Sequence, residues 1–120
     1  MQNKVLILGG YGNFGKRISI ALAKASIPII IAGRDRVKAE ELKLSLCSKH
    51  PGLFIETAIF DVHTSLPEQL IKLAPKVVVN TCGPFQNSNY LVAEICIYHK
   101  IHYIDLADGR DFVNGISRLD

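Results

Sequence analysis

A short apolar run, followed at once by a glycine-rich turn, opens this chain of 120 residues. The run is Lys4-Val5-Leu6-Ile7-Leu8, the turn is Gly9-Gly10-Tyr11-Gly12-Asn13-Phe14-Gly15, and a helical pattern begins at Asn13. The glycines satisfy two spacings together, G-x-G-x-x-G from Gly10 and G-x-x-G-x-x-G from Gly9. A strand, a turn and a helix in this order are typical of a βαβ array whose first helix presents its N-terminus to an anionic group.

Glycines at this spacing have separate physical roles. Gly9 or Gly10 permits the tight turn out of the strand. Gly12 lets a phosphate approach the backbone without meeting a Cβ atom, and Gly15 lets the helix pack close to the strand. Because a helix N-terminus offers free N–H groups, we interpret the turn as a dinucleotide site, against the alternative of a purely structural turn. The candidate cofactor-binding residues of this turn are Gly9, Gly10, Tyr11, Gly12, Asn13, Phe14 and Gly15.

Short β-rich runs alternate with helical patterns along the rest of the chain. We expect strands at residues 4–8, 29–32, 53–60, 76–81 and 102–106, and helices at residues 13–25, 36–50, 65–74 and 88–99. Asp35 is the predicted N-cap of the second helix, and Ser65-Leu66-Pro67-Glu68 is typical of a capping box with proline in the first turn. The expected buried stripes of the first two helices are Phe14, Ile18, Ala21, Leu22 and Ala25, then Val37, Ala39, Leu42 and Leu46.

Right-handed crossovers between such units give an α/β chain with a three-layer α/β/α Rossmann fold. We expect a parallel sheet of about five strands in the order 3-2-1-4-5, ending before a sixth strand that complete dinucleotide domains carry. Residues 1–120 then form one domain.

Composition restricts the class of protein further. A hydrophobic content of 48% and a charged content of 21% are typical of a globular protein, and a net charge of +3 is too small to favour nucleic acid. The cysteines Cys47, Cys82 and Cys96 lack C-x-x-C spacing and the histidines lack metal-ligand spacing, so we expect no disulfide framework and no metal site. Without an apolar leader or a run of ~18 apolar residues, a cytoplasmic chain that does not span a membrane is expected.

The end of the second strand predicts which nicotinamide cofactor is bound. An acidic residue at this point accepts hydrogen bonds from the adenosine ribose and selects NAD. In this chain the strand ends in Gly33-Arg34, and an arginine can make a bidentate contact with a 2′-phosphate. Asp35 is better placed as a helix cap, although in the alternative interpretation it is the ribose acceptor and Arg34 is solvated. We therefore expect NADP as the cofactor, with NAD as the alternative.

Candidate residues also follow the third and fourth strands, because nucleotides lie across the carboxyl ends of the strands in such sheets. Asp61 and Val62 follow the third strand, where they either meet the adenine edge or cap a turn. Asn80-Thr81-Cys82-Gly83 ends the fourth strand near the topological switch point, and Gly83 allows close approach of the nicotinamide-side ribose. No catalytic residue can be named from the sequence.

Five segments together resemble one known family. They are Val5-Leu6-Ile7-Leu8-Gly9-Gly10-Tyr11-Gly12-Asn13-Phe14-Gly15, Ile31-Ala32-Gly33-Arg34-Asp35, Val77-Val78-Val79-Asn80-Thr81-Cys82-Gly83-Pro84-Phe85, Tyr90-Leu91-Val92-Ala93-Glu94-Ile95-Cys96 and His102-Tyr103-Ile104-Asp105-Leu106-Ala107-Asp108-Gly109-Arg110. The chain resembles, over nearly its whole length, the N-terminal NAD(P)-binding domain of the saccharopine dehydrogenase-like family. This resemblance implies a Rossmann domain that carries NADP or NAD, with Asn80, Thr81, Cys82 and Gly83 lining the cofactor site. In complete members a second domain completes the substrate cleft and often supports dimerisation.

These observations predict the NADP(H)-binding domain of a saccharopine dehydrogenase-like oxidoreductase that transfers a hydride to or from a small-molecule substrate. The chain has no second domain, so we expect a fragment with little turnover of its own, and a homodimer is one assembly that the resemblance allows. One alternative is a sensor or regulatory module that binds NAD(P) without redox turnover. Another is an interaction scaffold whose glycine loop holds no ligand.

Overall fold

The computed structural model describes residues 3–81 and 100–105, and this part of the chain contains three helices and five strands. They are β1 (Val5–Leu8), α1 (Asn13–Lys24), β2 (Ile29–Gly33), α2 (Arg36–Lys49), β3 (Ile55–Ile59), α3 (Val62–Leu73), β4 (Val77–Asn80) and β5 (His102–Asp105). The helix expected at residues 88–99 and the candidate residues Cys82 and Gly83 lie outside the described residues.

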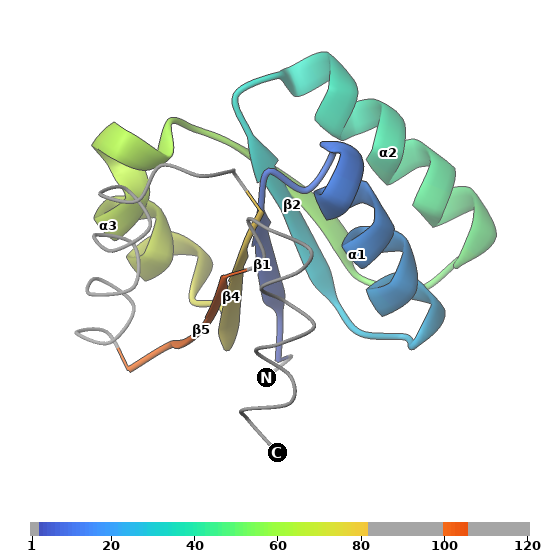
Figure 1. Ribbon diagram of the computed structural model, residues 1–120. Coiled ribbons are helices and arrows are strands. Elements are labelled where there is room, and N and C mark those ends of the chain that lie inside the picture. Colours follow the sequence, from blue (N-terminus) through green and yellow to red (C-terminus); the bar gives the residue numbers. More distant parts are fainter. Residues whose placement is uncertain (1–2, 82–99, 106–120) are drawn as a thin grey trace.

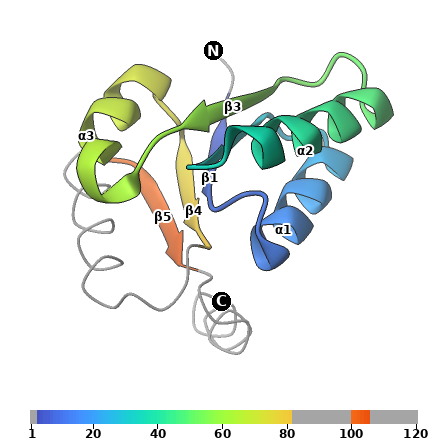
Figure 2. The same ribbon diagram turned by 90° about the horizontal axis from the view of Figure 1, so that it is seen from above.

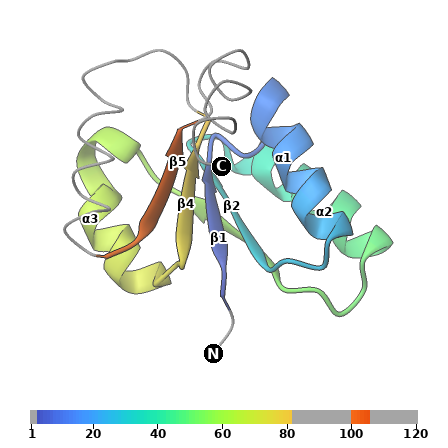
Figure 3. The ribbon, with the colours of Figure 1, turned by 60° about the horizontal axis from the view of Figure 1, so that its bottom comes forward.

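All five strands are parallel and lie in the order β3-β2-β1-β4-β5. The labelled strands β1, β2, β4 and β5 run in the same direction in Figure 3. Helices α1 and α2 cover one face of the sheet and α3 covers the other, as Figures 1 and 2 show from two sides. The predicted three-layer Rossmann fold with strand order 3-2-1-4-5 is therefore confirmed. Because every crossover returns to the same end of the sheet, the carboxyl ends of all strands share one edge.

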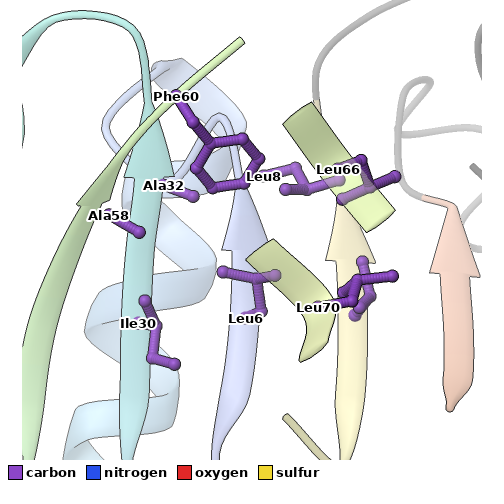
Figure 4. Packing of buried hydrophobic residues seen from close by; sticks show 9 residues of the cluster. Leu6, Leu8, Ile30, Ala32, Ala58, Phe60, Leu66 and Leu70 are labelled. Carbon is purple, nitrogen blue, oxygen red and sulfur yellow. The ribbon is translucent and has the colours of Figure 1, made fainter. Parts of the chain in front are cut away.

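Successive side chains of the central strands point to opposite faces of the sheet, and the core therefore consists of two clusters. Leu6 and Leu8 of β1 face the α3 side, whereas Ile7 faces α1 and α2. In Figure 4 the ring of Phe60 lies beside Ala32 and Leu8, with Leu66 of α3 beyond them. Strands β1 and β2 are thus buried on both faces, which explains why they read as continuous apolar runs.

The buried stripe expected for α1 is wrong at two of its positions, and the residues at its centre were not predicted. The fully covered positions are Gly15, Ser19 and Ala23, at intervals of four residues, while Ala21 and Ala25 are exposed. Small side chains on this line let the helix axis approach the sheet, and the larger Ile18 and Leu22 become half-buried flanks of the contact. A polar serine in the middle of a buried stripe is invisible to a pattern that counts only apolar residues.

Two further expectations for the helices need correction. Val37 is 66% exposed, because it lies two residues from Ala39 and so about 200° around α2 from the buried line of Ala39, Leu42 and Leu46. Helix α3 begins at Val62 and not at Ser65, so Pro67 lies inside the helix. The earlier start is supported by Asp61 O, which accepts hydrogen bonds from Thr64 N at 3.2 Å and Ser65 N at 3.0 Å.

Substitutions at two neighbouring residues of α3 test which face of the helix packs against the sheet. Leu70 is 2% exposed in the core, whereas Ile71 is 70% exposed. Replacing Leu70 by alanine should lower the free energy of unfolding by about 2–5 kcal/mol, through lost apolar burial and the cavity left behind. Ile71→Ala is the matched control and should change it by less than about 0.5 kcal/mol. Urea unfolding of both variants measures the difference, and similar losses would contradict the orientation of α3.

Candidate functional site

The carboxyl edge of the sheet brings together segments that are distant in sequence. Leu8 at the end of β1 pairs with Ala32 of β2 on one side and with Asn80 of β4 on the other. The glycine turn after β1, the Gly33–Arg34 step after β2 and Thr81 after β4 therefore meet at this edge. Figure 1 shows the β1–α1 and β2–α2 connections side by side above the sheet.

Gly9 makes the turn out of β1. Its φ angle is 77°, which favours glycine, and its N–H donates to Ala32 O at 2.8 Å, while Gly10 N–H donates to the same carbonyl at 3.2 Å. Gly12 N–H then donates to Gly9 O at 3.0 Å and closes the turn. Of the two glycines that the spacing left open, the positive φ assigns the turn to Gly9.

The other glycines of the turn differ in the space around them. A Cβ atom on Gly15 would collide with Gly9 O and lie 2.8 Å from Gly10 Cα, so α1 can approach the turn only with glycine there. On Gly12 the same atom would meet nothing nearer than Gly9 O at 3.4 Å, an ordinary contact. Gly15 is therefore required by packing within the protein, whereas Gly12 is open to a ligand.

Ser19 of α1 forms a hydrogen bond to the glycine turn, a contact that was not predicted from the sequence. Its side chain is fully buried, with Oγ lying 3.0 Å from Gly10 O and 2.8 Å from Gly15 O, both acceptors for its single proton. The hydroxyl thus joins α1 to the peptide group between Gly10 and Tyr11. The sequence did contain one indication of this role. Ser19 follows Gly15 by four residues and so lies on the same face of the helix, the face that the sequence places against the sheet.

The N-terminus of α1 is suited to an anion. Gly12 is the N-cap and has no side chain with which to cap the helix, and the first turn contains no acidic residue. Gly12 and Asn13 are exposed, whereas Phe14 is half-buried. The positive end of the helix dipole therefore lies at this edge of the sheet, where it favours a negatively charged group.

Tyr11 connects the glycine turn to the end of β2. Its hydroxyl accepts a hydrogen bond from Asp35 N at 2.8 Å, and its ring occupies the space that a Cβ atom on Gly33 would need. The Asp35 carboxylate accepts from Lys38 N at 3.2 Å and caps α2, as predicted. Arg34 is exposed beside them. An open hollow at this point is lined by Tyr11, Arg34, Asp35, Arg36, Val37 and Lys38.

The end of β4 supports the turn from the other side. Thr81 Oγ1 lies 2.7 Å from Leu8 O and 3.1 Å from Gly9 O, and donates its proton to these carbonyls. Asn80 is 1% exposed, and its amide donates to the Tyr103 hydroxyl at 3.1 Å. Both residues therefore lie at the predicted edge, but the contacts that they make in this structure position the backbone of β1, β4 and β5.

The remaining predicted residues lie at the start of α3. Asp61 precedes the helix and is half-buried, and Val62 is its first residue. Within residues 3–81 and 100–105, no three His, Cys, Asp or Glu side chains are grouped so that they could hold a metal ion. No helix in the described ranges has the length and apolar character needed to cross a membrane.

Solved structures share this fold at low sequence identity. Serine dehydrogenase from Escherichia coli superposes with a TM-score of 0.66 at 18% identity, over 85% of this chain and 60% of that one. YwfH, an NADPH-dependent reductase involved in bacilysin biosynthesis, gives a TM-score of 0.71 at 15% identity, over 88% of this chain and 54% of that one. An alternative dihydrofolate reductase from Brucella canis complexed with NADP gives a TM-score of 0.63 at 18% identity, over 77% of this chain and 48% of that one.

The chain thus spans about half to three-fifths of the length of these three structures. A search of curated proteins gave no match. The family model described as the saccharopine dehydrogenase NADP-binding domain matches residues 5–114, which include every element of the sheet and the glycine turn. This chain belongs to the saccharopine dehydrogenase NADP-binding domain family.

Proposed function

We propose that this chain binds NADP(H) at the carboxyl edge of its sheet, as the cofactor-holding domain of a saccharopine dehydrogenase-like oxidoreductase. The end of β2 carries the choice of cofactor. A ribose-binding carboxylate at position 33 would need the space that Tyr11 fills, and the carboxylate of Asp35 is engaged in capping α2. Arg34 is exposed at the same point. A guanidinium group matches a 2′-phosphate in charge and geometry.

The glycine turn supports the same proposal for the pyrophosphate. The open space above Gly12 admits a phosphate, and the start of α1, whose N-cap is a glycine and whose first turn has no acidic residue, supplies a positive dipole end. In this proposal Arg34 binds the adenosine end of the cofactor, and Gly33 and Asp35 border that end of the site. We assign Thr81 to the support of the turn, and we keep Asp61, Val62, Asn80, Cys82 and Gly83 as the proposed remainder of the site.

A bound nicotinamide would supply the hydride chemistry, while residues of this chain hold and orient the cofactor. Because the chain spans only part of the structures that it matches, we propose that a second domain in the full-length protein completes the substrate cleft. The general acid or base and the substrate contacts then come from that domain.

Reversing the charge at Arg34 tests the cofactor choice. Arg34→Asp should raise the Kd for NADPH by about 10- to 100-fold, because it removes charge-assisted hydrogen bonds to the 2′-phosphate, while the Kd for NADH stays unchanged or falls. Isothermal titration calorimetry with both nucleotides measures this. Lys72→Asp, at an exposed position of α3, makes the same change in net charge and should leave both constants unaltered. Equal weakening of both nucleotides by Arg34→Asp would reject the assignment.

Alanine substitutions at Gly15 and Gly12 should affect different properties of the protein, its stability in one case and its NADPH binding in the other. Gly15→Ala should lower the free energy of unfolding by about 1–3 kcal/mol, because its Cβ atom meets backbone that cannot move aside easily. Gly12→Ala fits the structure and should change stability by less than about 1 kcal/mol, yet weaken NADPH binding by placing a methyl group where the phosphate approaches. Thermal melting and calorimetry on both variants test this, and a Gly12→Ala chain that binds NADPH normally would contradict the phosphate site.

A further inference from the structure

Tyr11 stands at the junction of two hollows near the carboxyl edge of the sheet. One is the hollow that also includes Arg34, Arg36 and Lys38, and the other lies between the helices α1 and α2 and includes Lys16 and Lys38. Tyr11 also packs against the apolar cluster on this face of the sheet. The ring is therefore held by protein on one side and on the other borders a surface on which basic side chains outnumber the carboxylates of Asp35 and Glu41.

The hydroxyl of Tyr11 has one donor without a partner in the described part of the protein. Its oxygen accepts the N–H of Asp35 at 2.8 Å, which fixes the oxygen beside Gly33 and Arg34. Within residues 3–81 and 100–105, the structure shows no acceptor for the phenolic proton. A hydroxyl that is anchored through its oxygen, with its proton unused, is a preorganised donor.

We propose that Tyr11 is a specificity-determining residue, which donates its phenolic proton to an oxygen of the 2′-phosphate of NADP(H) beside the guanidinium of Arg34. This inference rests on the NADP(H) assignment above and adds a residue to the adenosine end of that site. A phosphate oxygen is the acceptor that suits this donor, because it carries negative charge and faces the cations of the same hollow. NADH has only a ribose hydroxyl at this position, so the phenol gains much less from it.

Tyr11 also acts against NADH by a second route. Its ring fills the space that any side chain at position 33 would need, so the strand end cannot carry a carboxylate while the ring stays in place. The same side chain thus provides a donor for the 2′-phosphate and excludes the acceptor that NAD-selective domains place there. Selectivity at this site is a property of the Tyr11–Gly33 pair together with Arg34.

Removal of the hydroxyl alone tests the proposal on the full chain. Tyr11→Phe should raise the Kd for NADPH about tenfold and leave the Kd for NADH within about twofold, as loss of one hydrogen bond to a charged group predicts. Thr57→Val is the control, since its hydroxyl donates to Glu40 between β3 and α2, away from the proposed site, and its loss should leave the NADPH-to-NADH ratio unchanged. Calorimetry with both nucleotides gives the four constants.

A double variant distinguishes a direct contact from an effect through Arg34. If the phenol touches the phosphate, Tyr11→Phe still weakens adenosine 2′,5′-bisphosphate binding in an Arg34→Ala background, and adenosine 5′-monophosphate binding is unaffected. If Tyr11 only holds Arg34 in place through Asp35, the additional loss disappears, and the proposed contact is overturned.

A measurement on the unmodified chain tests the same contact without any substitution. The ¹³C resonance of the Tyr11 Cζ atom should shift on addition of adenosine 2′,5′-bisphosphate and much less with adenosine 5′-monophosphate. Equal shifts, or full retention of NADPH preference by Tyr11→Phe, would overturn the role of Tyr11 and leave the NADP(H) assignment standing. An unmodified chain that does not prefer NADPH to NADH would overturn both.

Discussion

The close approach of α1 to the glycine turn is the contact on which the rest of the structure depends. Gly15 has no Cβ atom to separate the helix from Gly9 and Gly10, and Ser19 donates across the same interface. Thr81 ties the turn to β4 from the other side of β1. Because the turn is held from both sides, its backbone is in place before any ligand arrives, and binding need not include the free-energy cost of ordering it.

The adenosine end of the site is organised differently, through one aromatic side chain. Tyr11 extends from the turn to the end of β2, where it meets Gly33 and accepts the N–H of Asp35. This contact joins the proposed pyrophosphate region to the proposed 2′-phosphate region, so that residues far apart in sequence act on one ligand. The capping role of Asp35 is part of the same arrangement, because it leaves Arg34 as the exposed group at the strand end.

Some expectations from the sequence are wrong for reasons that can be named. The apolar pattern includes Ala21 and Ala25 in the stripe of α1, whereas the helix contacts the sheet through Gly15, Ser19 and Ala23, because a pattern that counts apolar residues overlooks the glycine and the serine of this line. A capping-box pattern predicts the start of α3 at Ser65, but the hydrogen bonds of Thr64 N and Ser65 N to Asp61 O belong to a helix that begins one turn earlier. In α1 a tertiary contact outweighs the local apolar pattern, and in α3 one local hydrogen-bonding pattern outweighs another.

The sequence by itself determined the alternation of strands and helices, the parallel sheet in the order β3-β2-β1-β4-β5, the cap at Asp35 and the family. These follow from patterns that are local or repeated along the chain, such as glycine spacing and runs of apolar residues. Only the tertiary structure decided that Gly9 makes the turn, that Ser19 and Thr81 hold it, and that Tyr11 fills the space beside Gly33. These contacts join residues brought together by the crossovers, and no local spacing encodes the distance between two side chains on different strands.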